Sequence, residues 1–378
     1  MKIAFIRLSA AVELNLSSAS INTLGTELRV GLFESLIRQG HTVKVYSGIR
    51  SADQKLTKTK SLFDTSSWIN KVQYEPLAFP KDEDILLIEQ GTDNVRYSYH
   101  DGEKETSYIK RTFDCISNWS GPVIYYQHGC LPFPFRTKDA SVETILNLRN
   151  LNKRSQLFKD KTWTIWHHFT NWDYYLSLKD NPYQPFKDQL SFKFTMLPYS
   201  DIEPWYTVKA NPKWDSLFIG SQWDSRSTKQ GFNREKQIQN LYDKSQLNTA
   251  IIGKWNEKDI SKFNHTKYLG MLGYHGDAYK YWNDSYTCLY TTSPTIGKAG
   301  LLPTRLTMPC RSGSVVLYED TLDCAKLFPK DWHINSSNVV DKVSSIKSLS
   351  PEERDKLRQL QLSKFPKWDE IKMEDLIK

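Results

Sequence analysis

The sequence predicts an α/β fold made of two doubly wound, Rossmann-like domains with a central cleft. Three observations lead to this fold class. First, 378 residues are too many for one compact core of ordinary size and suit two domains of nearly equal size. Second, the chain opens with a β-loop-α-β unit, the element from which parallel doubly wound sheets are built. Third, the same kind of pattern starts again near residue 215.

The opening unit can be followed residue by residue. An apolar run of strand length covers Lys2 to Leu8, and a loop rich in Ser and Asn follows it. A helix then begins near Glu27, because apolar residues recur at helical spacing from 28 to 37, and Gly40 ends it. The segment His41 to Ser47 predicts the second strand.

Two more strands are expected in the first half, at Ile85 to Glu89 and Pro122 to Gln127. Both are short, unbroken apolar runs, as is typical of buried parallel strands. A basic segment follows, from Arg136 to Lys161, with seven basic and three acidic residues, and its middle, Val142 to Leu157, predicts a helix.

The second half repeats the alternation of strands and helices. The expected elements are strands at Asp215–Gly220, Asn248–Gly253, Ser285–Tyr290 and Ser314–Tyr318, a helix from Arg234, and two short amphipathic helices from Pro351 onward. We therefore expect two α/β domains that meet near residue 200. A cleft between two such domains binds ligands at the carboxyl ends of the strands.

Charge and cysteine content narrow the setting. The formal net charge of +8 favours an acidic partner, such as nucleic acid, a nucleotide or an anionic surface. The five cysteines form no C-x-x-C pair, which fits a reducing compartment. Arg7 and Glu13 interrupt the apolar start, and no transmembrane stretch follows. These observations predict a cytoplasmic protein that does not associate with a membrane.

The first candidate site is the loop from Gly220 to Arg234, between a strand and a helix. Backbone N–H groups, hydroxyls and the arginines Arg226 and Arg234 at such a place are suited to bind a diphosphate. The alternative is a solvated loop whose arginines face water.

The second candidate is the segment Thr291 to Cys310, which leads through a helix with Arg305 to a strand and to the acidic pair Glu319-Asp320. Arg305 can form two hydrogen bonds to a phosphate from the same side as Arg234. The alternative is an ordinary connection between a helix and a strand.

The third candidate is His128, which directly follows a buried strand at its carboxyl end, where a general base is expected. A lone histidine is more often structural, and that alternative stays open. Asp82-Glu83-Asp84 precedes its strand and is interpreted as surface. His167-His168 lacks the spacing to other ligands that a metal site requires.

Taken in order, these stretches resemble the DNA β-glucosyltransferase family of T-even bacteriophages. The matching segments are MKIAFI, the helix near Glu27, VIYYQHGCLPF, LSFKFTMLPYSDIEP, DSLFIGSQWDSRSTKQGFNREK, AIIGKW and LLPTRLTMPCRSGSVVLYEDTLD, about two-thirds of the chain. The resemblance implies the two-domain GT-B architecture, with an acceptor-binding domain over 1–198, a nucleotide-binding domain over 199–355 and a C-terminal helix over 356–378 that packs back on the first domain. It also implies transfer of glucose, or of a pentose such as arabinose, from a UDP-sugar to a hydroxymethylated or hydroxylated pyrimidine, such as 5-hydroxymethylcytosine, in phage duplex DNA.

The resemblance also assigns roles by position. The donor diphosphate falls to Ser221, Arg226, Arg234 and Arg305, and the uracil to the backbone near Gly270 and Leu272. Glu27 reaches the donor sugar or the catalytic centre. The catalytic base of the family is an aspartate, and His128 stands at that position, as in the Tyr-Gln-His of the phage α-glucosyltransferase. The glutamate expected to bind the ribose falls at Met308.

The expected mechanism is direct displacement with His128 as base, with Mg²⁺ or Mn²⁺ able to assist without a dedicated protein site. The acceptor base is flipped out of the duplex, and Lys138, Arg149, Lys153 and Arg154 contact the DNA phosphates. A solvated helix face is the alternative for these four residues. We expect a monomer in the cytoplasm of an infected bacterium. The rival functions are transfer to a cell-surface glycan or a small molecule, and non-catalytic binding of a sugar or nucleotide.

Overall fold

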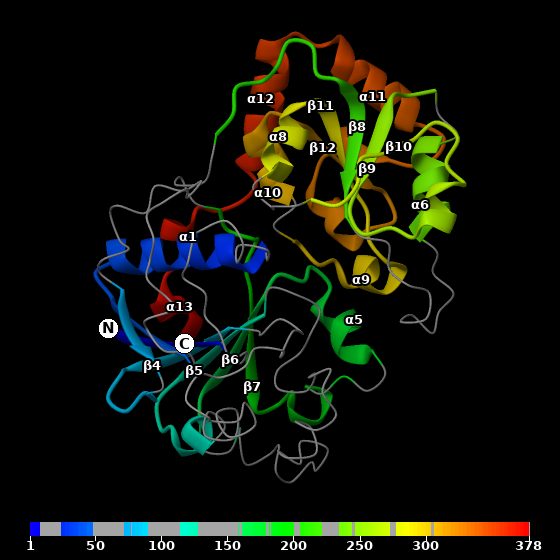
Figure 1. Cartoon of the computed structure of the whole chain (residues 1–378). Coiled ribbons are helices and arrows are strands. Elements are labelled where there is room, and N and C mark those ends of the chain that lie inside the picture. Colours follow the sequence, from blue (N-terminus) through cyan, green and yellow to red (C-terminus); the bar gives the residue numbers. More distant parts are fainter. Residues whose placement is uncertain are drawn as a thin grey trace. The chain divides into compact units, whose positions relative to one another are not determined.

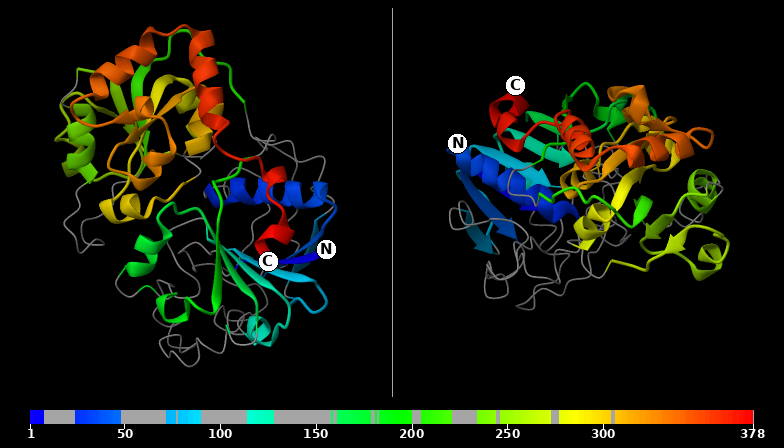
Figure 2. Two further views of the ribbon diagram at one scale, coloured as in Figure 1. Left: turned by 180° about the vertical axis from the view of Figure 1, so that it is seen from behind. Right: turned by 90° about the horizontal axis from the view of Figure 1, so that it is seen from above.

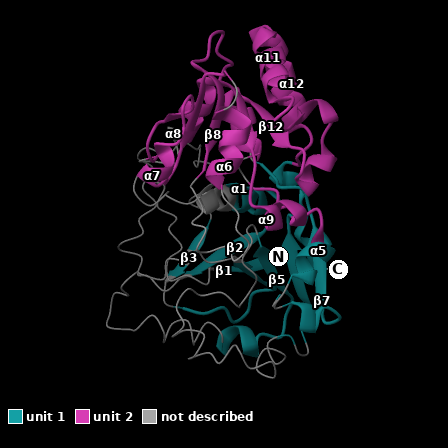
Figure 3. Ribbon diagram, turned by 90° about the vertical axis from the view of Figure 1, so that its right-hand side faces the viewer, with its two compact units in different colours: residues 1–168, 173–202, 367–378 teal, residues 169–172, 203–366 magenta. Residues whose placement is uncertain are grey.

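The computed structural model describes most of the chain (Figure 1). The described residues are 1–7, 24–47, 72–76, 78–89, 114–127, 158, 161–178, 181, 183–199, 205–220, 234–243, 246–272, 277–303 and 306–377. They fall into two compact units, which Figure 3 colours separately. Unit 1 comprises 1–168, 173–202 and 367–378, and unit 2 comprises 169–172 and 203–366. Relative to the expected domains, 169–172 belong to unit 2, and the return to unit 1 begins at 367 instead of 356.

Unit 1 is built on a seven-stranded parallel sheet with the order β3-β2-β1-β4-β5-β6-β7. The strands are β1 (Lys2–Arg7), β2 (Thr42–Ser47), β3 (Gln73–Pro76), β4 (Ile85–Glu89), β5 (Val123–Gln127), β6 (Trp163–His167) and β7 (Leu190–Phe194). The central strands are buried on both faces, which explains their unbroken apolar sequences. The chain order reverses between β1 and β4, as in a doubly wound fold.

Helix α1 (Leu24–Arg38) packs on this sheet, with the ring of Phe33 edge-on to Phe5 at 4.8 Å between centroids. Gly40 ends it with φ +82°, a conformation that glycine adopts without a steric penalty. The C-terminal segment also belongs here: Trp368 lies edge-on to Trp166, and α13 (Met373–Ile377) contacts β5 and β6 (Figure 2).

Unit 2 contains a six-stranded parallel sheet with the order β10-β9-β8-β11-β12-β13. The strands are β8 (Trp214–Ile219), β9 (Thr249–Ile252), β10 (Lys267–Tyr268), β11 (Ser285–Tyr290), β12 (Val315–Glu319) and β13 (His333–Ile334). This is the 3-2-1-4-5-6 order of dinucleotide-binding folds.

Helices flank the unit 2 sheet on both faces. The other helices whose bounds are described are α5 (Trp172–Ser177), which lies almost wholly in unit 1, and, in unit 2, α6 (Arg234–Ile238), which continues as a π-helix over Gln239–Asp243, α7 (Glu257–Ile260), α8 (Asp277–Asn283), α9 (Pro294–Ala299), α10 (Thr307–Ser312), α11 (Val339–Ser348) and α12 (Pro351–Leu362). Within the described residues, four short 3-10 turns connect the elements, at Gln184–Phe186, Asp323–Leu327, Lys330–Trp332 and Trp368–Glu370. Side chains from α6 and α11 share one core with Phe218, Leu289 and Leu317. Helix α8 contacts β8 and β11, and α10 contacts β12.

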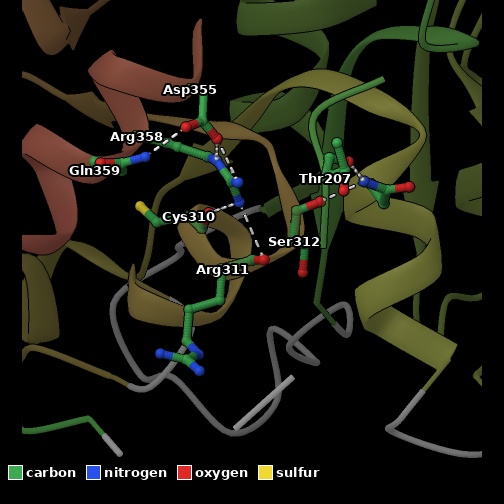
Figure 4. A network of polar contacts seen from close by, with 8 residues as sticks. Thr207, Cys310, Arg311, Ser312, Asp355, Arg358 and Gln359 are labelled. Carbon is green, nitrogen blue, oxygen red and sulfur yellow. Dashed lines mark hydrogen bonds and ion pairs between the residues drawn. The ribbon is translucent and has the colours of Figure 1, made fainter. Parts of the chain in front are cut away.

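Helix α12 is fixed to unit 2 by buried polar side chains. Ser350 and Glu353 form a capping box at its start. The guanidinium of Arg358 donates to the carbonyls of Cys310 (2.9 Å) and Arg311 (3.2 Å), as Figure 4 shows. Gln361 bonds both backbone groups of Val316 in β12. These contacts explain why this helix stays with unit 2.

Candidate functional site

The carboxyl ends of the unit 2 strands form the candidate site. Because chain order reverses between β8 and β11, the connections that follow these two strands leave in opposite directions, and ligands of doubly wound folds bind at that point. Gly220 follows β8 there, and Thr291 follows β11. Glu319 ends β12 on one side of them, and Gly270 follows β10 on the other.

Hydrogen bonds join the strand ends on the β10 side. The backbone N–H of Gly253 donates to the carbonyl of Gly270 at 3.0 Å, and Tyr268 Oη donates to the carbonyl of Gly253 at 3.0 Å. Trp255 Nε1 donates to the carbonyl of Gly220 at 2.9 Å. Gly270 has φ +91°, and open space surrounds the position of an added Cβ, so backbone conformation alone favours glycine there.

Arg234 is the first residue of α6 and is only 1% exposed. Its guanidinium lies over the ring of Phe218 in β8, 5.6 Å from the centroid. Burial raises the pKa of Glu319, and the positive charge of Arg234 opposes that rise. A positive charge is thus fixed beside the point where chain order reverses, which suits an anionic ligand.

A second group of polar side chains surrounds Glu319. Its Oε2 accepts hydrogen bonds from Thr291 Oγ1 and from Gln237 Nε2, the latter at 2.7 Å. The same Nε2 donates to the carbonyl of Thr292 at 3.2 Å. Burial raises the pKa of Glu319 above its usual value, while these donors and Arg234 oppose that rise. Side chains from the end of β12, from the residue after β11 and from α6 are therefore held together at this edge.

In unit 1, the side chain at the end of β5 is held by two tyrosines. Gln127 Nε2 donates to Tyr175 Oη at 2.9 Å, and Tyr183 Oη donates to Gln127 Oε1 at 2.9 Å. All three residues are buried. This arrangement fixes the residue that directly precedes His128 in the sequence.

The two neighbouring histidines of unit 1 are packed inside it. His168 lies with Nδ1 2.9 Å from the Thr195 carbonyl and Nε2 3.1 Å from Tyr126 Oη. A carbonyl only accepts, so Nδ1 carries the proton and Nε2 accepts from the tyrosine. Burial, aided by His168, lowers the pKa of His167 to about 3, which keeps that imidazole neutral.

Most of the predicted site residues lie outside the described part of the chain. These are His128, Lys138, Arg149, Lys153, Arg154, Ser221, Arg226 and Arg305. Glu27 lies in α1, of which only the backbone is described at that position. Arg234 and Gly270 both lie at the carboxyl edge of the unit 2 sheet, and Leu272 is half-buried two residues after Gly270. Met308 is buried in α10.

The sequence assigned no role to Glu319, Gln237 or Thr291. The acidic residue after an apolar strand was visible in the sequence, and its position alone could have identified it as a candidate ligand-binding group. Its partners come from residues 82 and 28 positions earlier, and nothing in the sequence pairs them. Asp82 is exposed, whereas Glu83 is buried beneath Lys44 and Tyr46, so the expectation of a surface segment is wrong for Glu83.

Two further properties concern the described residues only. No group of three or more His, Cys, Asp or Glu side chains among them is placed to hold a metal ion. None of the helices described above is long and apolar enough to cross a membrane.

Two doubly wound parallel sheets, with a C-terminal segment that returns to the first unit, define the GT-B fold. No protein-family model matches the sequence, and no curated protein sequence matches it. Several solved structures, in contrast, have a similar fold. The DNA modifying enzyme β-glucosyltransferase, studied with and without uridine diphosphoglucose, is similar over 96% of this chain and 94% of its own, with TM-score 0.60 and 15% identity.

Two other solved structures share the fold. The sucrose-phosphate synthase of Thermosynechococcus elongatus is similar over 100% of this chain and 95% of its own, with TM-score 0.53 and 9% identity. Anabaena HepE, in complex with UDP-glucose, is similar over 97% of this chain and 96% of its own, with TM-score 0.50 and 11% identity. At these identities, the similarities establish the GT-B fold of this chain.

Proposed function

We propose that the protein is a glycosyltransferase that transfers a sugar from a UDP-sugar to a hydroxymethylated or hydroxylated pyrimidine in duplex DNA. The observation that carries this proposal is the similarity to the DNA-modifying β-glucosyltransferase over 96% of the chain. The ordered sequence resemblance to the same family, from MKIAFI to the segment ending at Asp323, supports it independently of the structure.

In this proposal, unit 2 binds the donor. The diphosphate lies where chain order reverses, between Gly220 and Thr291, and is bound by Arg234 together with Ser221, Arg226 and Arg305. The uracil lies toward β10, against the backbone from Gly270 to Leu272. The buried position of Arg234 supports its part, since a guanidinium fixed before the ligand arrives loses little entropy on binding.

The proposed reaction is a direct displacement. The acceptor hydroxyl oxygen attacks the anomeric carbon, the bond from that carbon to the diphosphate oxygen breaks, and His128 accepts the hydroxyl proton. The arginines stabilise the negative charge that develops on the departing UDP. Glu27 contacts the donor sugar or the catalytic centre. The Gln127 contacts with Tyr175 and Tyr183 support the role of His128, because they hold the preceding residue in place.

The proposed acceptor requires a DNA-binding surface on the first half of the chain. The segment from Arg136 to Lys161 supplies it with seven basic residues against three acidic ones. Replacement of Lys138, Arg149, Lys153 and Arg154 by Ala should weaken DNA binding and reduce its salt dependence, while UDP binding stays unchanged. Unchanged DNA affinity across a salt series would remove this surface from the proposal.

The decisive experiment uses duplex DNA that contains 5-hydroxymethylcytosine, incubated with a panel of UDP-sugars and analysed by nucleoside mass spectrometry. We expect a mass gain on the modified base that is lost in His128→Ala and retained in His265→Ala, a control at an exposed histidine of unit 2. The mass also identifies the sugar. If UDP binds but no donor modifies the DNA, the acceptor is instead a glycan or a small molecule.

A further inference from the structure

The carboxylate of Glu319 has one oxygen occupied and one open. Oε2 accepts from Thr291 Oγ1 and from Gln237 Nε2. Within the described part of the chain, no donor bonds Oε1, and Glu319 is half-buried. The two donors hold the side chain by Oε2, the inner oxygen, and leave Oε1, the outer oxygen, available to a ligand at the end of β12.

The strand order places this oxygen on a particular side of the proposed donor. Along the edge, Gly270 follows β10, Gly220 follows β8, Thr291 follows β11 and Glu319 ends β12. A UDP-sugar has its diphosphate in the middle, between the nucleoside and the transferred sugar. With the diphosphate between β8 and β11 and the nucleoside toward β10, the transferred sugar extends toward β12.

We propose that Glu319 is a specificity-determining residue whose outer oxygen accepts a hydrogen bond from a hydroxyl of the transferred sugar. The inference rests on the proposed function. A carboxylate accepts hydrogen bonds and does not donate them, so it favours a hydroxyl over the phosphate oxygens of the donor. The raised pKa of Glu319 fits this position, because the group lies partly out of water beside the diphosphate site. The same charge disfavours a donor whose sugar is a uronic acid.

The variant Glu319→Gln tests the contact with little change in shape. Its amide oxygen must stay on the inner side to accept from Thr291 and Gln237, so the amide NH₂ points outward and replaces an acceptor by a donor. The measurement is the binding of UDP, UDP-glucose and UDP-arabinose by calorimetry. The quantity of interest is the gain in affinity that the sugar adds to UDP.

We expect Glu319→Gln to reduce this gain about tenfold, or about 1.4 kcal/mol, for the sugar that the wild-type protein binds best. The affinity for UDP itself should stay within about threefold of wild type, since the nucleoside and diphosphate contacts remain. Asp320→Asn is the matched control, because Asp320 is exposed and bonds Asn335, and it should change neither affinity. Deoxy analogues of the best donor, tested on the wild-type protein, should show the same loss for one hydroxyl without any substitution.

Several results would overturn the inference. One is that Glu319→Gln leaves the affinity gain from the sugar unchanged and no deoxy analogue binds more weakly. Another is that Glu319→Gln loses equal affinity for UDP and for the UDP-sugar, which would assign Glu319 to the nucleotide. A third is that the wild-type protein binds UDP but gains no affinity from a sugar. A wild-type protein that binds neither UDP nor any UDP-sugar would instead overturn the proposed function itself.

Discussion

Substitution of Glu83 offers a stringent test of how unit 1 is held together. Its carboxylate is buried where the chain enters β4, and accepts from Tyr46 Oη at 2.6 Å and from the Lys81 backbone N–H at 3.0 Å. Lys44 Nζ lies 3.0 Å away. These groups lower the pKa of Glu83 from its usual 4.5 to about 2, although burial, the largest single influence, acts in the opposite direction.

The shift converts into a stability that depends on pH. A difference of about 2.5 pKa units corresponds to about 3 kcal/mol of preference for the charged form in the folded protein. Because the pKa is lower in the folded state, this stabilisation is complete above pH 4.5 and is lost as the pH falls toward 2. Glu83→Gln should therefore lower the free energy of unfolding by about 3 kcal/mol at pH 7.

The assay is urea unfolding of both proteins at pH 7 and near pH 3, followed by a signal from unit 1. The difference between wild type and Glu83→Gln should shrink at the lower pH, where part of the wild-type stabilisation has been lost. Asp82→Asn is the control, since Asp82 is exposed one residue earlier, and it should change stability by less than about 0.5 kcal/mol. A difference that is equally large at both pH values would refute the electrostatic explanation.

Two further predictions concern unit 2. Gln361→Leu removes the partners of the Val316 backbone N–H and carbonyl, so it should lower the free energy of unfolding by about 2–4 kcal/mol. Gln359→Leu, at an exposed site of the same helix, is the control and should be nearly neutral; equal denaturation midpoints for the two variants would contradict the prediction. Gly300→Ala combines φ +70° with a Cβ placed 1.8 Å from Thr170 Oγ1, so its melting temperature should fall further than that of Gly270→Ala, which has only the unfavourable φ.

Several elements could be predicted from the sequence because burial on both faces leaves an unbroken apolar run. The expected strands Ile85–Glu89 and Ser285–Tyr290 coincide with β4 and β11. The helix before Gly40 is also confirmed, since Leu32, Phe33 and Leu36 are buried. Local sequence is sufficient in these cases because neighbouring residues alone set the hydrophobic pattern and the end of the helix.

Edge strands were not predicted, for a physical reason. β7 is half-exposed along most of its length, and β10 and β13 have two residues each, so their sequences lack a continuous apolar run. The helix that the sequence predicts from Arg234 changes to a π-helix at Gln239, a change in hydrogen bonding that its amphipathic pattern does not reveal.

The sequence by itself determined the fold class and the start of each α/β half, because these depend on patterns within a few residues. Only the tertiary structure decided which strands lie side by side. It also brought Glu319 to Thr291 and Gln237 and buried Glu83 beneath Tyr46. Strand order and the pairing of distant side chains follow from how the whole core packs, and a carboxylate in the sequence does not disclose which donors will surround it.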